Sequence, residues 1–360
     1  MRADSYETLD PGGGRAMVRP ESRQLLKEVD AVVFDCDGTL IDVRRSYDAT
    51  IMRTVRTMVE EFSGVSLPME DVGGELILKI RRTGGFNSDW DTAYALSLLS
   101  EVAIEQRPSK VGAGLDHILD RLGELVADFS SRNRLAGRRS IDRYLDRAGL
   151  ASDGLKEFQR FLGYPGNAMQ SKMAETFDQI YYGGRLFREI YGVMPAVWYD
   201  QGLIERETLF FSRDDVVRFK KIIGGKKMAI VTGRSFVAVR HTMGRLLQHF
   251  ERDASVYIGD GDVHPELASE LVKYRKPSGA SLIRAIEKLS AKVLLYIGDS
   301  AEDRLMVDDA RKRYGNILFA GIYGSSFNER AQISYFGGTG SDLLVKSLSQ
   351  VPSVLEMIRK

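Results

Sequence analysis

The sequence predicts an α/β fold: a Rossmann-like, mainly parallel sheet with an inserted, enlarged all-helical domain. Short apolar runs alternate with amphipathic helical segments, which is typical of parallel strands joined by helices. A long stretch from residue 42 to about residue 212 shows helical periodicity only, and this predicts the insert. The length of 360 residues is sufficient for two domains.

The first predicted strand, residues 31–34, ends in Asp35 and Asp37, which Gly38 follows. Side chains two positions apart in a strand share a face, so the two carboxylates can converge on one point. Open α/β sheets build their ligand sites at this carboxyl edge. We therefore expect the two acids to share a divalent cation, which prefers hard oxygen ligands. A solvated turn is the alternative interpretation.

The domain boundaries follow from the change in pattern. Residues 1 to about 20 have mixed charges and three consecutive glycines without apolar periodicity, which predicts a flexible leader. Residues 21–41 and 213–360 are assigned to the α/β core, with a short helix over residues 21–29. Residues 42–212 are assigned to the helical cap domain.

Within the insert, apolar residues recur three or four positions apart, and Gly, Pro and Asn separate the segments. The absence of alternating apolar segments argues against strands in this part of the sequence. The predicted helices of the insert lie near residues 46–62, 89–104, 114–129, 141–150, 154–162 and 169–182.

After the insert, strand and helix patterns alternate again. The predicted strands are residues 228–231, 255–258, 293–297 and 317–322. The predicted helices are residues 214–223, 235–250 and 281–289. A second Gly-Asp sequence, residues 259–262, is interpreted as a loop.

Three more polar sites follow in chain order. Thr232 and Gly233 come directly after the predicted strand at residues 228–231, and Lys276 precedes a proline at the start of a helix. Asp299 comes just after the predicted strand at residues 293–297, and Asp303 comes four residues later. Taken singly, each has an ordinary explanation as a strand-end hydroxyl, a solvated lysine or a helix cap. Their joint order is more informative than any one of them.

Together these motifs resemble, in the same order, the four motifs of the haloacid dehalogenase (HAD) superfamily. The chain is identified as a member of the subfamily with a helical cap inserted after the first core strand, similar to phosphoglycolate phosphatases. The resemblance implies a Mg²⁺-dependent phosphatase that hydrolyses a small phosphorylated metabolite through an aspartyl-phosphate. The insert is larger than the usual cap of that family, which leaves the substrate undetermined.

The resemblance implies that Asp35 is the nucleophile, and that Asp37 is the general acid and then the base for water. A carboxylate held on a cation resists protonation whereas its neighbour can exchange a proton, so the chemistry supports this division. Asp37 favours phosphoryl transfer over carbon–halogen cleavage, because dehalogenases of the family lack this acid. The alternatives are a phosphomutase with the same aspartyl-phosphate chemistry and a non-catalytic binding module.

The other implied roles are the binding of metal and of phosphate. The implied Mg²⁺ ligands, with Asp37 contributing its backbone carbonyl, are Asp35, Asp37, Asp299 and Asp303. Asp303 alternatively positions Lys276. The implied phosphate-binding groups are a hydroxyl, a backbone amide and an ammonium, from Thr232, Gly233 and Lys276.

Substrate recognition is assigned to the insert. A glycine-rich stretch before the helix at residue 89 contains an amide, acids and an indole, so Asn87, Asp89 and Trp90 are the first candidates. Asp89 as a helix N-cap is the alternative. Arg44 and Arg45 either contact a substrate anion or lie at the solvated start of a helix. We expect the insert to be a lid that excludes water and reopens for product release.

Composition limits the partners. Lys and Arg number 51 against 50 for Asp and Glu, a net charge of +1 that argues against nucleic acid or an anionic membrane surface. No apolar run is long enough to span a bilayer, and the single cysteine cannot form an internal disulfide. We expect a cytoplasmic protein whose partner is a small-molecule phosphomonoester. The oligomeric state stays open.

Overall fold

The computed structural model divides the chain into two compact units. We call residues 1–43 with 207–360 the core unit, and residues 44–206 the helical unit. The residues that the structure describes are 6–83, 86, 88–107, 114–132, 137–225, 227–326 and 328–360.

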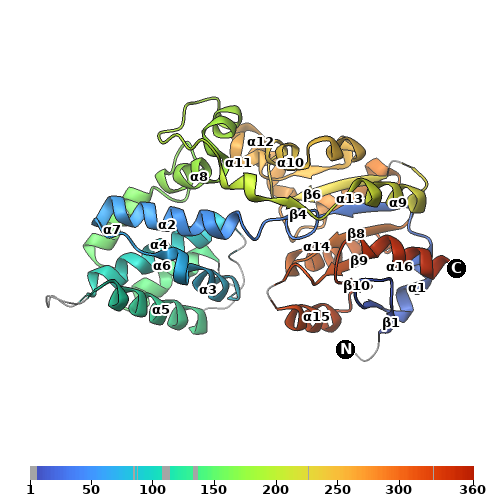
Figure 1. Cartoon of the computed structure of the whole chain (residues 1–360), viewed down its shortest axis with the longest axis horizontal. Coiled ribbons are helices and arrows are strands. Elements are labelled where there is room, and N and C mark those ends of the chain that lie inside the picture. The colour runs from blue at the N-terminus through green and yellow to red at the C-terminus, as the bar shows by residue number, and fades with distance from the viewer. Residues whose placement is uncertain are drawn as a thin grey trace. The chain divides into compact units, whose positions relative to one another are not determined.

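An eight-stranded sheet forms the middle layer of the core unit, in the order β1-β2-β10-β9-β8-β3-β6-β7 (Figure 1). All neighbours from β10 to β7 pair in parallel. These six strands are β3 (Ala31–Phe34), β6 (Met228–Thr232), β7 (Val256–Tyr257), β8 (Leu294–Gly298), β9 (Ile317–Ile322) and β10 (Leu343–Val345). The predicted α/β fold with a mainly parallel sheet is confirmed.

The sheet is buried on both faces, and every residue of β3, β6, β8 and β9 is buried. This explains why these strands appear in the sequence as continuous apolar runs. The helices that pack on one face are α1 (Arg23–Lys27), α9 (Arg213–Ile223), α10 (Phe236–Met243) and α16 (Gln350–Arg359). Those on the other face are α13 (Ala280–Leu289), α14 (Ala301–Arg311) and α15 (Glu329–Gly338).

Short elements complete the core unit. A two-stranded ribbon of β4 (Ile41–Asp42) and β5 (Thr208–Leu209) lies where the chain leaves and re-enters the core. Residues 259–262, predicted as a loop, instead begin a short helix. The remaining elements are η2 (Pro20–Ser22), η4 (Gly244–His249), η5 (Arg252–Ala254), α11 (Asp260–Val263), α12 (Pro265–Leu271) and η6 (Val272–Tyr274).

The predicted flexible leader is wrong for the part of it that the structure describes. β1 (Glu7–Leu9) and β2 (Ala16–Val18) pair with each other, and β2 pairs antiparallel with β10. The Gln350 side chain also donates to the carbonyl oxygens of Gly12 and Gly14, at 2.9 and 3.0 Å. Three-residue strands are too short to show alternation in the sequence, and long-range pairing supplies their hydrogen bonds.

The described elements of the helical unit are all helices. At its centre every residue of α4 from Thr92 to Ile104 is buried. Helix α3 was not predicted from the sequence, because Gly73 and Gly74 lower its helix propensity. A Cβ atom at Gly73 would lie 2.5 Å from the Met52 side chain, so packing explains this glycine. The elements of the unit are α2 (Tyr47–Ser63), α3 (Met69–Arg81), α4 (Asp89–Glu105), α5 (Leu115–Arg132), α6 (Arg138–Arg147), α7 (Asp153–Leu162), α8 (Lys172–Tyr191) and η3 (Leu203–Arg206).

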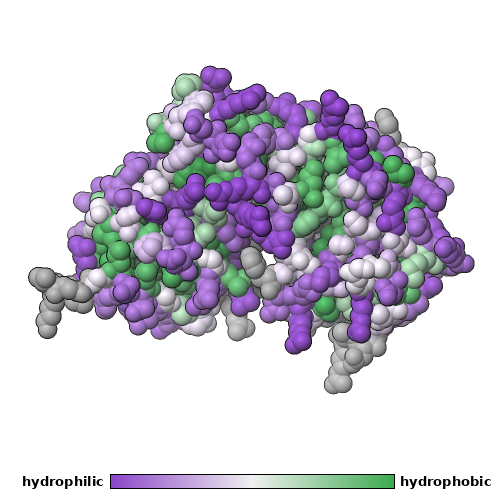
Figure 2. Space-filling view, in the orientation of Figure 1, coloured by the Kyte–Doolittle hydropathy of each residue, from purple (hydrophilic) through white to green (hydrophobic). Residues whose placement is uncertain are grey.

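Hydrophilic residues are spread over the visible face of both units, with hydrophobic residues between them (Figure 2). Exposed large apolar side chains in the helical unit include Met194, Val197 and Trp198. Single exposed apolar residues are ordinary on protein surfaces. Within the described part of the chain, no helix is long and apolar enough to cross a membrane.

The Phe34 ring anchors β3, with ring centroids of Phe211, Phe219 and Phe250 at 5.7, 5.2 and 5.6 Å. Phe34→Ala should therefore lower the unfolding free energy of the core unit by about 3–5 kcal/mol, measured by urea denaturation followed by far-UV circular dichroism. The control Leu267→Ala, at an exposed position, should change it by about 0.5 kcal/mol or less. A Phe34→Ala loss as small as that of the control would contradict this anchoring role.

Candidate active site

Three adjacent strands position the first site residues. β3 lies between β8 and β6, with Phe34 opposite Ile297 in one pairing and opposite Ile230 in the other. Asp35 directly follows β3, Thr232 is the last residue of β6, and Asp299 directly follows β8. The carboxyl ends of parallel strands meet at one edge of a sheet, so these polar side chains lie at the same edge.

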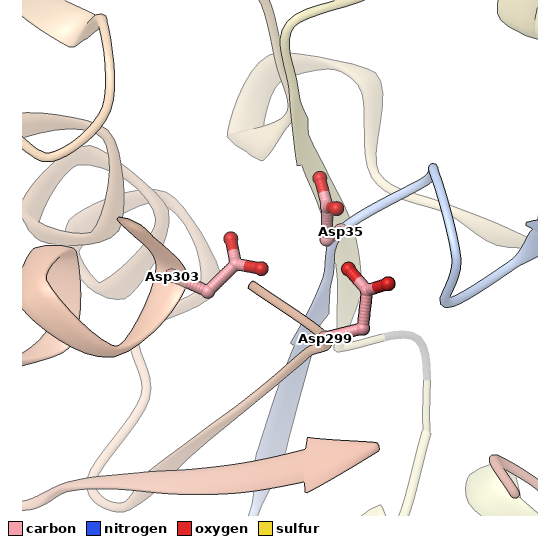
Figure 3. A group of neighbouring side chains, drawn as sticks. All are labelled: Asp35, Asp299 and Asp303. Carbon is pink, nitrogen blue, oxygen red and sulfur yellow. The ribbon is translucent and has the colours of Figure 1, made fainter. Parts of the chain in front are cut away.

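Three carboxylates converge at this edge. One oxygen from each of Asp35, Asp299 and Asp303 lies within 4.8 Å of the others. Figure 3 shows Asp35 and Asp299 side by side at their strand ends, with Asp303 pointing toward them from its helix. Asp303 is fixed by a capping box at the start of α14, where its Oδ2 accepts a 2.7 Å hydrogen bond from the Ser300 hydroxyl.

Lys276 joins two of these carboxylates. Its Nζ donates to Asp35 Oδ1 at 2.6 Å and to Asp303 Oδ1 at 2.7 Å, and its side chain is 11% exposed. The Tyr296 hydroxyl also donates to Asp303 Oδ1, at 2.8 Å. Asp303 thus holds the lysine in place, which is the second role that the sequence left open for this acid.

The cluster contains more negative charge than Lys276 offsets. Burial raises the pKa of Asp35 to about 7, with Lys276 opposing and Asp303 and Asp37 adding to the shift. Burial, together with Asp35 and Asp303, raises the pKa of Asp299 well above its usual range. Burial alone would raise the pKa of Asp303 too, but Lys276 and its hydrogen bonds hold it below its ordinary value.

This donor set fits a hard divalent cation. Carboxylate oxygens are the ligands that Mg²⁺ prefers, and a cation would offset the charge that burial disfavours in Asp35 and Asp299. The residues that could hold it are Asp35, Asp299 and Asp303. The Asp37 carboxylate, which was expected to converge on the cation with Asp35, lies outside this group of carboxylates and contacts Arg234 instead. The ligand that the resemblance implies for Asp37 is its backbone carbonyl, which this contact does not involve.

Asp299 has three neighbours that the motifs did not assign to its surroundings. Gly38 has a φ of +71°, and a Cβ atom there would lie 1.8 Å from Asp299 Oδ2, so only glycine fits. The Ser325 hydroxyl donates to Asp299 Oδ2 at 3.2 Å, and the Gln332 side chain donates to the Asp299 carbonyl at 2.5 Å. Ser325 and Gln332 lie after the last motif, and no local sequence pattern marks them as site residues.

The Asp37 carboxylate accepts a hydrogen bond from Arg234 Nε. Both other nitrogens of this guanidinium donate to Glu207, each at 2.8 Å. The Arg234 and Glu207 side chains are 1% and 0% exposed. Sequence reasoning singled out neither residue: Arg234 lies in the second motif beside Gly233, whereas nothing local marks Glu207.

The loop after β6 places the predicted phosphate-binding groups. Thr232 is buried, and its Oγ1 accepts a 3.2 Å hydrogen bond from the backbone N–H of Arg234, while Gly233 is exposed. Gly259 lies against this loop, because a Cβ atom there would lie 2.6 Å from the Ser235 nitrogen. The absence of a side chain at Gly259 therefore lets the 259–262 segment approach the backbone of this loop closely.

The candidate recognition residues of the helical unit are partly engaged within that unit. Asp89 pairs with Arg81 at 2.7 Å, and Trp90 Nε1 donates to Asp178 Oδ1 at 3.2 Å. The N-cap of α4 is Ser88, so the alternative role of Asp89 as N-cap is wrong. Asn87 lies outside the described residues.

The first two residues of the helical unit are the other recognition candidates. Arg44 and Arg45 are both exposed and directly precede Ser46, the N-cap of α2. Their position agrees with either of the two roles that the sequence left open, a contact with a substrate anion or the solvated start of a helix.

Comparison with known proteins agrees with this geometry. Residues 29–310 match the family model described as haloacid dehalogenase-like hydrolase. The chain is similar to the phosphatase Tt82 from Thermococcus thioreducens, with 23% identity, a TM-score of 0.55 and coverage of 90% of this chain and 98% of that one. A structure from the Northeast Structural Genomics Consortium has 18% identity, a TM-score of 0.61 and coverage of 91% and 98%. No curated protein matches.

Metal binding should be visible in thermal stability. The folded-state pKa of Asp35 is raised from 3.8 to about 7, so without metal the folded state loses stability as the pH rises through this window. Mg²⁺ should therefore raise the melting temperature more at pH 7.5 than at pH 5.5, measured by differential scanning fluorimetry against EDTA. At 100 times the dissociation constant the stabilisation is about 2.7 kcal/mol.

Asp299→Asn removes one of the crowded charges and one ligand. It should raise the melting temperature in EDTA at pH 7.5 and abolish the increase on adding Mg²⁺. The control Glu75→Gln, at an exposed position of α3, should behave like the wild type. A full Mg²⁺ effect in Asp299→Asn would show that this carboxylate is not a ligand.

Proposed function

The chain belongs to the family of haloacid dehalogenase-like hydrolases, and we propose that it is a Mg²⁺-dependent phosphatase acting on a small phosphorylated metabolite. The observation that supports this most is the carboxylate cluster at the carboxyl edge of the sheet, where Lys276 bridges Asp35 and Asp303 beside Asp299. Asp37 stands two residues from Asp35 and outside that carboxylate group.

Asp35 is proposed as the nucleophile. The 2.6 Å hydrogen bond from Lys276 fixes its carboxylate, and burial excludes water that would otherwise compete with it. Attack forms a bond from an Asp35 oxygen to phosphorus while the bond from phosphorus to the leaving oxygen breaks. The product of this step is an aspartyl-phosphate, which water then hydrolyses.

Asp37 is proposed as the acid and base. Its side chain is 36% exposed, so a leaving group or a water molecule can reach it. It would protonate the leaving oxygen in the first step and take a proton from the attacking water in the second. This acid is also the feature that favours phosphoryl transfer over carbon–halogen cleavage.

The phosphoryl oxygens need positive charge and hydrogen-bond donors. We propose that the donors come from Thr232 and the Gly233 backbone N–H at the end of β6. The positive charge comes from Lys276, between η6 and α13. Mg²⁺ held by Asp35, Asp299, Asp303 and the Asp37 carbonyl would neutralise part of the phosphoryl charge. The phosphatase name of the Thermococcus relative supports the same reaction.

The helical unit is proposed to be a lid that reads the leaving group. Both of its connections start at the β4–β5 ribbon, and this ribbon is joined to the Asp37 turn by the hydrogen bond from Gly38 N to Ile41 O. The entering connection is therefore close to Asp37 along the chain, and the pairing of β5 with β4 brings the returning connection beside it. The proposed recognition residues remain Arg44, Arg45, Asn87, Asp89 and Trp90.

Asp35→Asn should lower phosphate release by roughly 10³-fold or more, because an amide cannot attack phosphorus. The assay is phosphate release from phosphorylated metabolites and p-nitrophenyl phosphate with Mg²⁺ present. The control Asp253→Asn changes an exposed acid of the core unit and should keep wild-type rates.

Two outcomes of this assay would contradict the proposal. Wild-type rates in a folded Asp35→Asn protein would exclude Asp35 as the nucleophile. A wild-type protein that released phosphate from no member of the panel would favour the binding-module alternative. Release without any added phosphorylated activator counts against a phosphomutase.

A further inference from the structure

The strongest unexplained feature of the core unit is the buried ion pair between Arg234 and Glu207. Two parallel hydrogen bonds of 2.8 Å join them, and the two side chains are 1% and 0% exposed. Buried charges are costly to desolvate, and apolar residues of similar size often stabilise a fold as well or better. Stability alone is therefore a weak reason for this pair, and its other contacts suggest a different one.

The pair fixes the plane of the guanidinium. Glu207 takes both terminal nitrogens of Arg234, and this leaves Nε directed at the Asp37 carboxylate. The guanidinium is planar and rigid, so holding its two terminal nitrogens also sets the direction of the Nε–H bond. Arg234 thus links Glu207 to the Asp37 carboxylate.

Glu207 is itself held in place. The Thr242 hydroxyl, from α10, donates to Glu207 Oε2 at 2.9 Å. The backbone N–H of Arg234 donates to Thr232 Oγ1 at 3.2 Å, which ties the same arginine to the end of β6. One helix, α10, and one strand, β6, therefore determine where the guanidinium lies.

The position of Glu207 in the chain adds a second point. It is the first residue of the core unit after the helical unit, and it directly precedes β5. β5 pairs with β4, which follows the Asp37 turn. The contact therefore pins the returning connection to the same guanidinium that holds Asp37.

We propose that Glu207 is a positioning residue for the acid–base step: through Arg234 it orients the Asp37 carboxylate toward the leaving oxygen. The inference rests on the phosphatase function proposed above. The Asp37 side chain is 36% exposed, and the Arg234 contact restricts the directions in which its carboxylate can point. Proton transfer requires that the acid be within hydrogen-bond reach of the leaving oxygen.

Leaving-group dependence separates positioning from a general structural role. An alkoxide must be protonated as it leaves, whereas p-nitrophenolate leaves without a proton. Loss of Asp37 orientation should therefore slow the hydrolysis of glycerol 2-phosphate much more than that of p-nitrophenyl phosphate. The value to compare is kcat/KM, because it reports the steps up to leaving-group departure.

The test variant is Glu207→Gln, which is nearly isosteric and removes one charge of the pair. We expect kcat/KM to fall by about 10–100-fold for glycerol 2-phosphate, and by about threefold or less for p-nitrophenyl phosphate. Asp37→Asn should show the same selectivity with a larger loss. Adding Glu207→Gln to Asp37→Asn should cause no further selective loss, since the two residues act through one contact.

Two further variants keep the test valid if Glu207→Gln does not fold. Thr242→Val removes only the hydrogen bond to Glu207 and should give a smaller loss with the same selectivity. Asp215→Asn is the matched control, because Asp215 is also a buried carboxylate of the core unit but belongs to the capping box of α9, where it accepts from Ser212. It should not alter the ratio of kcat/KM for the two esters.

Equal losses for the two esters, or no loss in folded Glu207→Gln and Thr242→Val, would overturn the inference and leave the proposed phosphatase function intact. A wild-type protein that releases phosphate neither from the two esters nor from any member of the metabolite panel would instead overturn the proposed function, and the inference with it.

Discussion

The crowding of three buried carboxylates against one ammonium is the constraint on which the site depends. Asp35, Asp299 and Asp303 lie within 4.8 Å of one another, and Lys276 contacts two of them. Burial opposes their ionisation, so the edge of the sheet requires more positive charge than the chain supplies. A divalent cation held by these carboxylates would offset this imbalance.

The two acids of the first motif differ in their burial and in the cationic side chain that binds them. Asp35 is buried and bound by Lys276, whereas Asp37 is partly exposed and bound by Arg234. Lysine and arginine differ in a useful way here. The compact ammonium bridges two carboxylates of the cluster, and the planar guanidinium transmits the position of Glu207 to Asp37.

The sequence predicted the parts of this arrangement that are local. Apolar runs buried on both faces marked the strands, and polar residues at their ends marked the site edge. It could not predict Glu207, Ser325 or Gln332, because their roles arise from contacts between segments far apart in the chain. The same reason explains why β1 and β2 were missed, since pairing with β10 rather than local pattern makes them strands. Family membership gives the order of the motifs but not these supporting contacts.

The claim that Asp35 becomes phosphorylated can be tested directly by trapping the intermediate. The protein would be mixed with Mg²⁺ and a phosphomonoester that it hydrolyses, quenched in acid and reduced with borohydride, which converts an aspartyl-phosphate to homoserine. Peptide mass spectrometry is expected to find homoserine at position 35 only in samples that contained substrate. Homoserine at another acid, or phosphate release with Asp35 unmodified throughout turnover, would contradict the claim.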